Sequence, residues 1–198
     1  DEPEGSGKFI ATLFRNPALA EALESLLYKR DGLVLGVCNG FQALIKLGLL
    51  PYGHIQPLKA DSPTLTYNTI GRHLSRMVDT KVVSTMSPWF ANVKAGDIHT
   101  VAISHGEGRF VASPEQIRQL AAKGQIATQY VDLNGKATYD STFNPNQSVF
   151  AVEGITSPDG RVLGKMAHTE RYTGETMFRN IDGNKVQPIF AAGTEYFK

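Results

Sequence analysis

A continuously apolar run between two helical segments is the feature that most constrains how this chain can fold. Residues 33–37, LVLGV, contain no polar side chain, which is typical of a strand covered on both faces in a parallel sheet. The preceding segment, residues 16–32, carries apolar residues at helical spacing, and Asn16 can cap its start. Residues 40–47 again have a helical pattern, which Gly48 can end. This order of helix, buried strand and helix predicts an α/β layered fold.

The rest of the chain is richer in short β-type runs. A further helix is predicted at residues 113–124, where Ser113 is the N-cap and Gln116 completes a capping box. The predicted strands are TLTYN (64–68), KVVST (81–85), TVAIS (100–104), QIATQYV (125–131), VFAVEGI (149–155) and RVLGKMAH (161–168). Neither a repeat nor a long linker divides the sequence, so residues 1–198 are predicted to form a single domain.

The charge and cysteine content of the chain limit the kinds of partner that it is expected to bind. The formal net charge is +1 over 198 residues, so neither a nucleic-acid surface nor a membrane surface is predicted. Arg72, Arg76 and Lys81 are close in sequence and are interpreted as a solvated face. No apolar run is long enough for a membrane span, and no signal peptide is found. The single cysteine, Cys38, excludes an internal disulfide and favours a reducing, cytoplasmic setting.

Cys38 lies where the apolar strand should turn into the next helix, within the sequence GVCNGFQ. Gly36 and Gly40 would let the backbone close at a sharp turn that exposes a nucleophile. The start of the helix would direct N–H groups and its positive end at the sulfur, which favours thiolate. The N–H of Asn39 would point at the oxygen of a carbonyl under attack and supply half of an oxyanion hole. The alternative is a buried structural cysteine.

A reactive cysteine needs a base, and two His-x-Glu pairs could supply it. His105 and Glu107 lie in SHGEGRF, and His168 and Glu170 lie in MAHTER. Residues two apart on an extended segment point the same way, so either carboxylate could orient its imidazole and complete a triad with Cys38. Either pair could also bind a metal, but no third ligand has suitable spacing, and no metal site is predicted. The other histidines are predicted to be structural or surface residues: His54, His73 and His99.

Several motifs together carry a family resemblance. GVCNGFQ resembles the G-x-C-x-G-x-Q elbow of class I (triad-type) glutamine amidotransferases, and AHTER is similar to their P-H-P-E-R segment. Five further segments resemble one branch, the glutaminase domain at the C-terminus of the large, single-chain phosphoribosylformylglycinamidine synthase. They are NTIGR, SHGEGRF, NPNQS, VEGITSPDGRVLGKM and the opening DEPEGSGKFIA. The resemblance covers nearly the whole chain. It implies a flavodoxin-like class I glutaminase fold, with a mostly parallel sheet, helices on both faces, and the active site at the carboxyl ends of the strands.

The resemblance also implies roles for individual residues. Cys38 would be the nucleophile, His168 the base and then the acid, and Glu170 the carboxylate that orients it. The N–H of Asn39 would serve the oxyanion, and Gln42 would help to hold the glutamine substrate.

His105 is then left as a substrate-binding residue, because Gly106 and Gly108 suggest a turning loop at the pocket rim or a domain contact. Two departures from the family pattern are noted. Ala167 and Thr169 replace the usual prolines beside the histidine, with little effect expected. Family domains begin with a strand-helix-strand segment and a glycine-rich oxyanion loop, and this chain is expected to lack both and to be the C-terminal major part of such a domain.

The implied reaction is hydrolysis of glutamine to glutamate and ammonia through a cysteine thioester. Ammonia would pass to a synthase domain, in the same long chain or a separate one, which uses ATP and Mg²⁺ to convert formylglycinamide ribonucleotide to its amidine. No cofactor is expected in this chain, and the isolated segment is expected to be weakly active or inactive. The alternatives are a non-catalytic docking module, the glutaminase domain of another amidotransferase, and a stand-alone cysteine hydrolase. Gln42 and the C-terminal His-x-Glu argue against the last.

Overall fold

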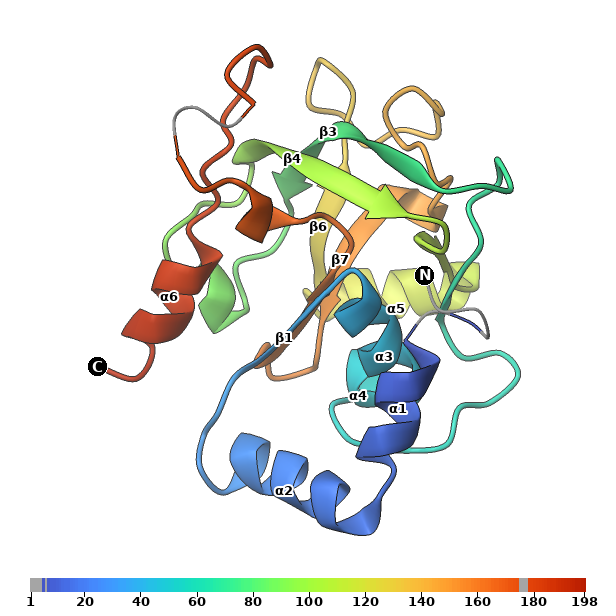
Figure 1. Cartoon of the computed structure of the whole chain (residues 1–198), viewed down its shortest axis with the longest axis vertical. Helices are drawn as coiled ribbons and strands as arrows, with labels where there is room; N and C mark the ends of the chain where they lie inside the picture. The colour runs from blue at the N-terminus through green and yellow to red at the C-terminus, as the bar shows by residue number, and fades with distance from the viewer. Residues whose placement is uncertain (1–4, 6, 175–177) are drawn as a thin grey trace.

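A computed structural model describes residues 5, 7–174 and 178–198 of the chain (Figure 1). Part of the opening motif, residues 1–4 and 6, lies outside these residues. The strands are β1 Val34–Val37, β2 Thr64–Thr66, β3 Leu74–Val82, β4 Ile98–His105, β5 Arg109–Val111, β6 Ile126–Tyr130, β7 Val152–Thr156 and β8 Val162–Lys165. The helices are α1 Lys8–Phe14, α2 Pro17–Tyr28, α3 Asn39–Leu47, α4 Leu49–Tyr52, α5 Pro114–Ala122 and α6 Ile189–Glu195. Three short 3₁₀ helices are η1 Pro88–Phe90, η2 Val149–Ala151 and η3 Thr169–Arg171.

Across the described residues, the main sheet has the strand order β1-β8-β7-β6-β3-β4, and β2 pairs with β5 separately. Only β1 and β8 are parallel among its pairings, whereas the other four neighbouring pairs are antiparallel. The α/β class is confirmed, but the predicted mostly parallel sheet is wrong for these strands. The SPDG turn shows the reason, because the short connection between β7 and β8 can only join antiparallel neighbours.

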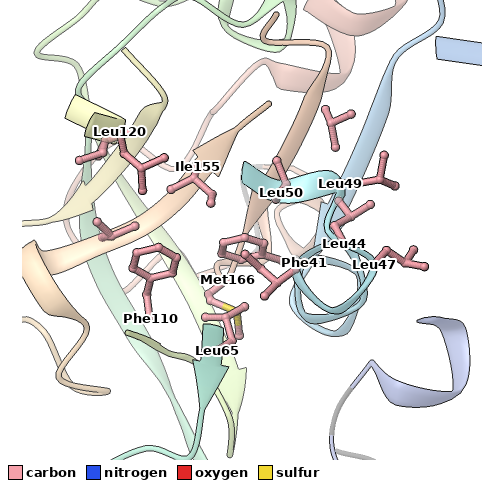
Figure 2. Packing of buried hydrophobic residues seen from close by; sticks show 14 of the residues in the cluster. Phe41, Leu44, Leu47, Leu49, Leu50, Leu65, Phe110, Leu120, Ile155 and Met166 are labelled. Carbon is pink, nitrogen blue, oxygen red and sulfur yellow. The ribbon is translucent and has the colours of Figure 1, made fainter. Parts of the chain in front are cut away.

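Helices cover both faces of the sheet, as predicted (Figure 1). Neighbouring residues of β8 show the two faces. Val162 joins the larger apolar cluster, which includes residues of α3, α4 and α5, whereas Leu163 joins a second cluster with residues of η1 and α6. Figure 2 shows the larger cluster, where Phe41 lies beside Met166. None of the helices in the described part of the chain is long and apolar enough to cross a bilayer.

A pair of glycines seats helix α3 on the sheet. Gly36 of β1 and Gly164 of β8 are partners in the parallel pairing. A Cβ on Gly36 would lie 2.5 Å from Leu44 Cδ1, and one on Gly164 would collide with the ring of Phe41. A Cβ on Gly40 would meet nothing within 4 Å. The predicted need for a small residue at the turn therefore holds for Gly36 but not, by the same steric test, for Gly40.

The starts of helices α2 and α5 agree with the sequence, whereas strand β3 differs from it. The Oδ1 of Asn16 accepts the N–H of Ala18 at 3.1 Å at the start of α2, and α5 has the predicted capping box. Strand β3 begins well before the predicted KVVST run and takes in Arg76. Its first residues pair with β4, and only Thr80–Val82 also pair with β6. This half of β3 therefore lacks a second neighbouring strand and tolerates charged side chains that hide the strand pattern.

Candidate active site

Cys38 occupies a strained turn between β1 and α3. It is the N-cap of α3, with φ 52° and ψ −105°. This left-handed φ is unfavourable for a residue with a Cβ, so the surrounding structure must hold it in place. The Cys38 N–H donates to the backbone oxygen of Lys165 at 2.8 Å, and the Gln42 N–H donates to the oxygen of Cys38 at 3.1 Å. The predicted strand-to-helix elbow is present, with the geometry typical of a nucleophile.

The Cys38 thiol is largely buried, at 8% exposure, and donates to the oxygen of Ser104 on β4 at 3.5 Å. Burial raises the pKa of this thiol, while the Asn39 N–H and the Arg171 guanidinium partly oppose that rise. The helix start thus acts on the thiol pKa in the predicted direction, toward thiolate, but desolvation outweighs it and the net shift favours the thiol. The Asn39 N–H interacts with the sulfur, so this donor lies next to the atom beside which the predicted oxyanion would form.

His168 and Glu170 form a close pair. His168 Nδ1 lies 2.5 Å from Glu170 Oε1, and the His168 N–H donates to the oxygen of Ala102 at 2.7 Å. With Nδ1 hydrogen-bonded to a carboxylate, the proton of a neutral ring resides there and Nε2 is left as the basic nitrogen. The pair belongs to the turn of η3 and not to the extended segment that the sequence suggested. The His168–Glu170 contact is the one that the predicted orienting role of Glu170 requires.

Strand β4 brings the thiol and the imidazole to one place. Cys38 Sγ contacts the oxygen of Ser104, and the His168 N–H contacts the oxygen of Ala102, two positions earlier on the same strand. The Nε2 of His168 lies 3.5 Å from a guanidinium nitrogen of Arg171, and the thiol hydrogen bond goes to Ser104. The elbow and the His168 turn thus both contact β4, and the thiol is hydrogen-bonded to Ser104 instead of to the imidazole.

His105 lies deeper than the sequence suggested. Its side chain is fully buried, so the predicted place at a pocket rim is wrong. Its Nδ1 lies 3.2 Å from Asn68 Oδ1 and acts as the donor, and its ring packs where a Cβ on Gly108 would collide. Burial, followed by the charges of His73 and His168, lowers the pKa of His105 to about 4. The imidazole is therefore neutral at pH 7.

Asn68, which sequence reasoning missed, holds the loop that follows His105. Its Nδ2 donates to the oxygen of His105 at 2.8 Å, its Oδ1 accepts the N–H of Gly108 at 3.2 Å, and its own N–H donates to the oxygen of Gly106 at 2.8 Å. On the other side, Nε2 of the fully buried Gln42 donates to the oxygen of Glu107. The loop is therefore fixed between Asn68 and the elbow helix. The NTIGR motif, which begins with Asn68, was the available signal.

Other neighbours of the site were also missed. His73 Nε2 lies 3.0 Å from Ser104 Oγ, the same residue whose backbone oxygen receives the thiol. Lys165 and Glu153 are fully buried under the His168 turn, and the lysine in the apolar run RVLGKM was the signal for them. In the part of the chain that the structure describes, no three His, Cys, Asp or Glu side chains are grouped as metal ligands.

The α/β sheet and the cysteine elbow facing a His-x-Glu turn define the class I glutaminase fold. The chain belongs to the CobB/CobQ-like glutamine amidotransferase domain family, whose sequence model matches residues 1–197.

Curated relatives and a solved structure agree. The phosphoribosylformylglycinamidine synthase subunit PurQ of Acaryochloris marina is 40% identical over 145 residues, which are 73% of this chain and 56% of that protein. The subunit of the same name from Chlorobaculum tepidum is 35% identical over 159 residues, which are 80% of this chain and 62% of that protein. The structure of PurLQS from Thermotoga maritima aligns with a TM-score of 0.68 at 25% identity, covering 95% of this chain and 72% of that one. The chain thus spans about three fifths of the length of these two PurQ relatives.

Proposed function

We propose that this chain is the glutaminase part of a phosphoribosylformylglycinamidine synthase and hydrolyses glutamine to glutamate and ammonia. The observation that carries the proposal is the juxtaposition, along β4, of the strained Cys38 elbow and the His168–Glu170 pair. Relatives that bear the name of this synthase's PurQ subunit support the choice among amidotransferases.

The residues support a complete reaction cycle. His168 Nε2 takes the thiol proton, and Cys38 Sγ attacks the side-chain amide carbon of glutamine. The N–H of Asn39 donates to the developing oxyanion, and the imidazolium returns the proton to the leaving ammonia. Water, activated by the same imidazole, then cleaves the γ-glutamyl thioester to glutamate and frees the thiol. Glu170 holds Nδ1 protonated throughout, which keeps Nε2 available as base and acid.

Two further residues serve the substrate in this proposal. The Oε1 of Gln42 is buried without a hydrogen-bond partner, so it can accept a bond from bound glutamine. His105 acts from within the loop that Gln42 holds, and its neutral ring shapes the substrate side of the site.

The ammonia is proposed to pass to a synthase component that binds ATP and Mg²⁺ and aminates formylglycinamide ribonucleotide in the cytoplasm. The relatives named above carry the glutaminase as a separate subunit, and the solved neighbour is a PurLQS assembly. A synthase component fused to the same chain is the other arrangement, and size analysis of the purified complete protein distinguishes them.

A non-catalytic docking module is the second candidate, and one observation favours it. The thiol has a raised pKa and donates to Ser104 instead of His168 in this structure. The proposed enzyme must therefore assemble its triad when glutamine or the synthase binds, because closure often completes a catalytic site. A docking module would show no such change.

The test measures glutamate formed from glutamine by the complete protein with its synthase component. Cys38→Ser should abolish glutamate formation and leave amidine synthesis from added ammonia intact, since only the glutaminase step needs the thiol. Glutamate formation at the wild-type rate in Cys38→Ser, or none in the wild-type protein with all synthase substrates present, would contradict the proposal.

A further inference from the structure

A buried ion pair lies under the candidate catalytic histidine. Lys165 ends β8 and Glu153 is the second residue of β7, and the side chains of both are fully buried, with Nζ 3.8 Å from Oε1. Removing two charges from water costs about as much as their attraction returns, so a pair of this kind contributes little to stability on average. Its presence here therefore needs a different explanation.

The hydrogen bonds of the pair converge on the two residues that flank His168. Lys165 Nζ donates to the backbone oxygen of Ala167 at 2.9 Å and to Thr169 Oγ1 at 2.8 Å. Glu153 Oε1 accepts the N–H of Ala167 at 2.7 Å. Both backbone polar groups of Ala167 and the side chain of Thr169 are thus held from inside the protein. His168 is the residue between them.

The same lysine also holds the other half of the site. Its backbone oxygen accepts the N–H of Cys38 at 2.8 Å, at the strained elbow. One residue therefore fixes the nucleophile through its backbone and the turn of the base through its side chain. Burial lowers the pKa of the Lys165 ammonium, and the carboxylates of Glu153 and Glu170 oppose this, which places the ammonium within the field of the proposed triad.

Hydrogen bonds from neighbouring residues fix the side chains of the ion pair and of Thr169 in place. Thr128 Oγ1 donates to Glu153 Oε2, and Thr169 Oγ1 donates to Gln187 Oε1 at 2.6 Å while it accepts from Lys165. A Cβ on Gly154 would lie 2.8 Å from the hydroxyl of Thr128 and would crowd this network. Each hydroxyl has a defined donor or acceptor role, so the network favours one position of the turn over its neighbours.

We propose that Lys165 and Glu153 are a positioning pair that holds the imidazole of His168 in register with the Cys38 thiol. The inference rests on the proposed glutaminase function for its meaning in catalysis. The structural claim, that the pair fixes the His168 turn, can be tested by a measurement that does not depend on glutaminase activity.

The first test is Lys165→Met in the complete protein, which replaces the ammonium by an apolar chain of similar length. The kcat for glutamine hydrolysis should fall about 100-fold with KM changed less than about 3-fold, because a misplaced base slows chemistry more than binding. Synthesis from added ammonia should stay at the wild-type rate. Thr169→Val, which removes one of the two acceptors of Nζ, should lower kcat in the same direction by about 10-fold.

Lys81→Met is the matched control. Lys81 lies on β3 of the same sheet, and its Nζ also donates to a backbone oxygen, that of Gly135. The control variant should leave kcat unchanged. The double variant Glu153→Gln with Lys165→Met removes both charges and keeps an acceptor for the Ala167 N–H. Lys165→Met alone leaves the Glu153 carboxylate buried without its ion-pair partner, so it should lower the midpoint of urea unfolding. The double variant should restore that midpoint while its kcat stays low.

The second readout is the downfield proton resonance of His168 Nδ1–H, which a hydrogen bond from Nδ1 to the Glu170 carboxylate should produce. It should be lost or broadened in folded Lys165→Met and kept in Lys81→Met. An unchanged resonance or a wild-type kcat in Lys165→Met, or a wild-type kcat in the double variant, would overturn the positioning role. A wild-type protein that shows the resonance but no Cys38-dependent glutamate formation overturns the proposed function instead, and the resonance still decides on the pair.

Discussion

The Nδ1 of His168 and the Oε1 of Glu170 are 2.5 Å apart, whereas the His105 Nδ1 bonds the neutral amide of Asn68. Only the first of the two His-x-Glu pairs has its imidazole on a carboxylate, which is what a general base requires for its charged form to be stabilised. The structure thus favours His168 over His105 on an observation independent of family resemblance.

His168→Ala should therefore lower glutamine-dependent synthesis by about 100- to 10,000-fold, the usual contribution of general acid–base catalysis. Glu170→Ala should cost less, because an orienting carboxylate is less critical than the base. His105→Ala should act mainly on KM for glutamine. Each variant is assayed with glutamine and with ammonia, and ammonia-dependent synthesis should survive in all three. An inactive His105→Ala beside an active His168→Ala would reverse the assignment.

The positive charge of Arg171 should have a measurable effect on the pKa of the Cys38 thiol. Its guanidinium lowers the pKa of Cys38, against the larger effect of burial. Arg171→Gln should therefore raise that pKa further and move the midpoint of the iodoacetamide labelling rate to higher pH. Arg118→Gln, which removes an exposed arginine paired with Glu115 on α5, is the control and should leave the midpoint in place. A midpoint that moves to lower pH in Arg171→Gln would contradict this electrostatic assignment.

The elbow and the helix caps could be predicted from sequence because their causes are local. A glycine beside a turn, an Asn before Pro17, and a Ser113 to Gln116 capping box all act within a few residues. The sign of the thiol pKa shift could not be predicted, because it depends on burial by β4, whose residues lie far along the chain. The same limit explains why the ion pair of Lys165 was missed, since its partner Glu153 lies on a different strand, β7.

Steric contact between α3 and the sheet should make Gly164 intolerant of substitution. Gly164→Ala places a methyl group against Phe41, and overpacking of this kind costs about 1–3 kcal/mol of unfolding free energy. Gly40→Ala is the matched control, because its added methyl group would meet no other atom within 4 Å. Alanine is favoured over glycine in a helix by roughly 1 kcal/mol, so this variant should be no less stable than the wild-type chain. Urea denaturation followed by the fluorescence of Trp89, the only tryptophan of the chain, measures both. Equal stability of the two variants would show that α3 is not seated on the glycine pair.

His105 should make the protein less stable in acid. Its pKa is about 4 in the folded chain, against about 6.5 when unfolded, so the unfolded chain binds more protons between these values. The stabilising contribution is therefore fully present above pH 6.5 and is lost as the pH falls through 4. Between pH 7 and pH 4 the wild-type chain should lose on the order of 3 kcal/mol more unfolding free energy than His105→Gln, which cannot titrate there.

The comparison is made by urea denaturation at pH 7, 5.5 and 4, with the difference between the two proteins taken at each pH. Other titrating groups, including the buried His99 whose pKa is also lowered by burial, act equally in both and cancel. His54→Gln, at an exposed position, should keep the wild-type slope. If His105→Gln lost stability in acid as steeply as the wild-type chain, the ring would have to be already charged or not buried in the folded protein, and its place behind Asn68 and Gly108 would be wrong.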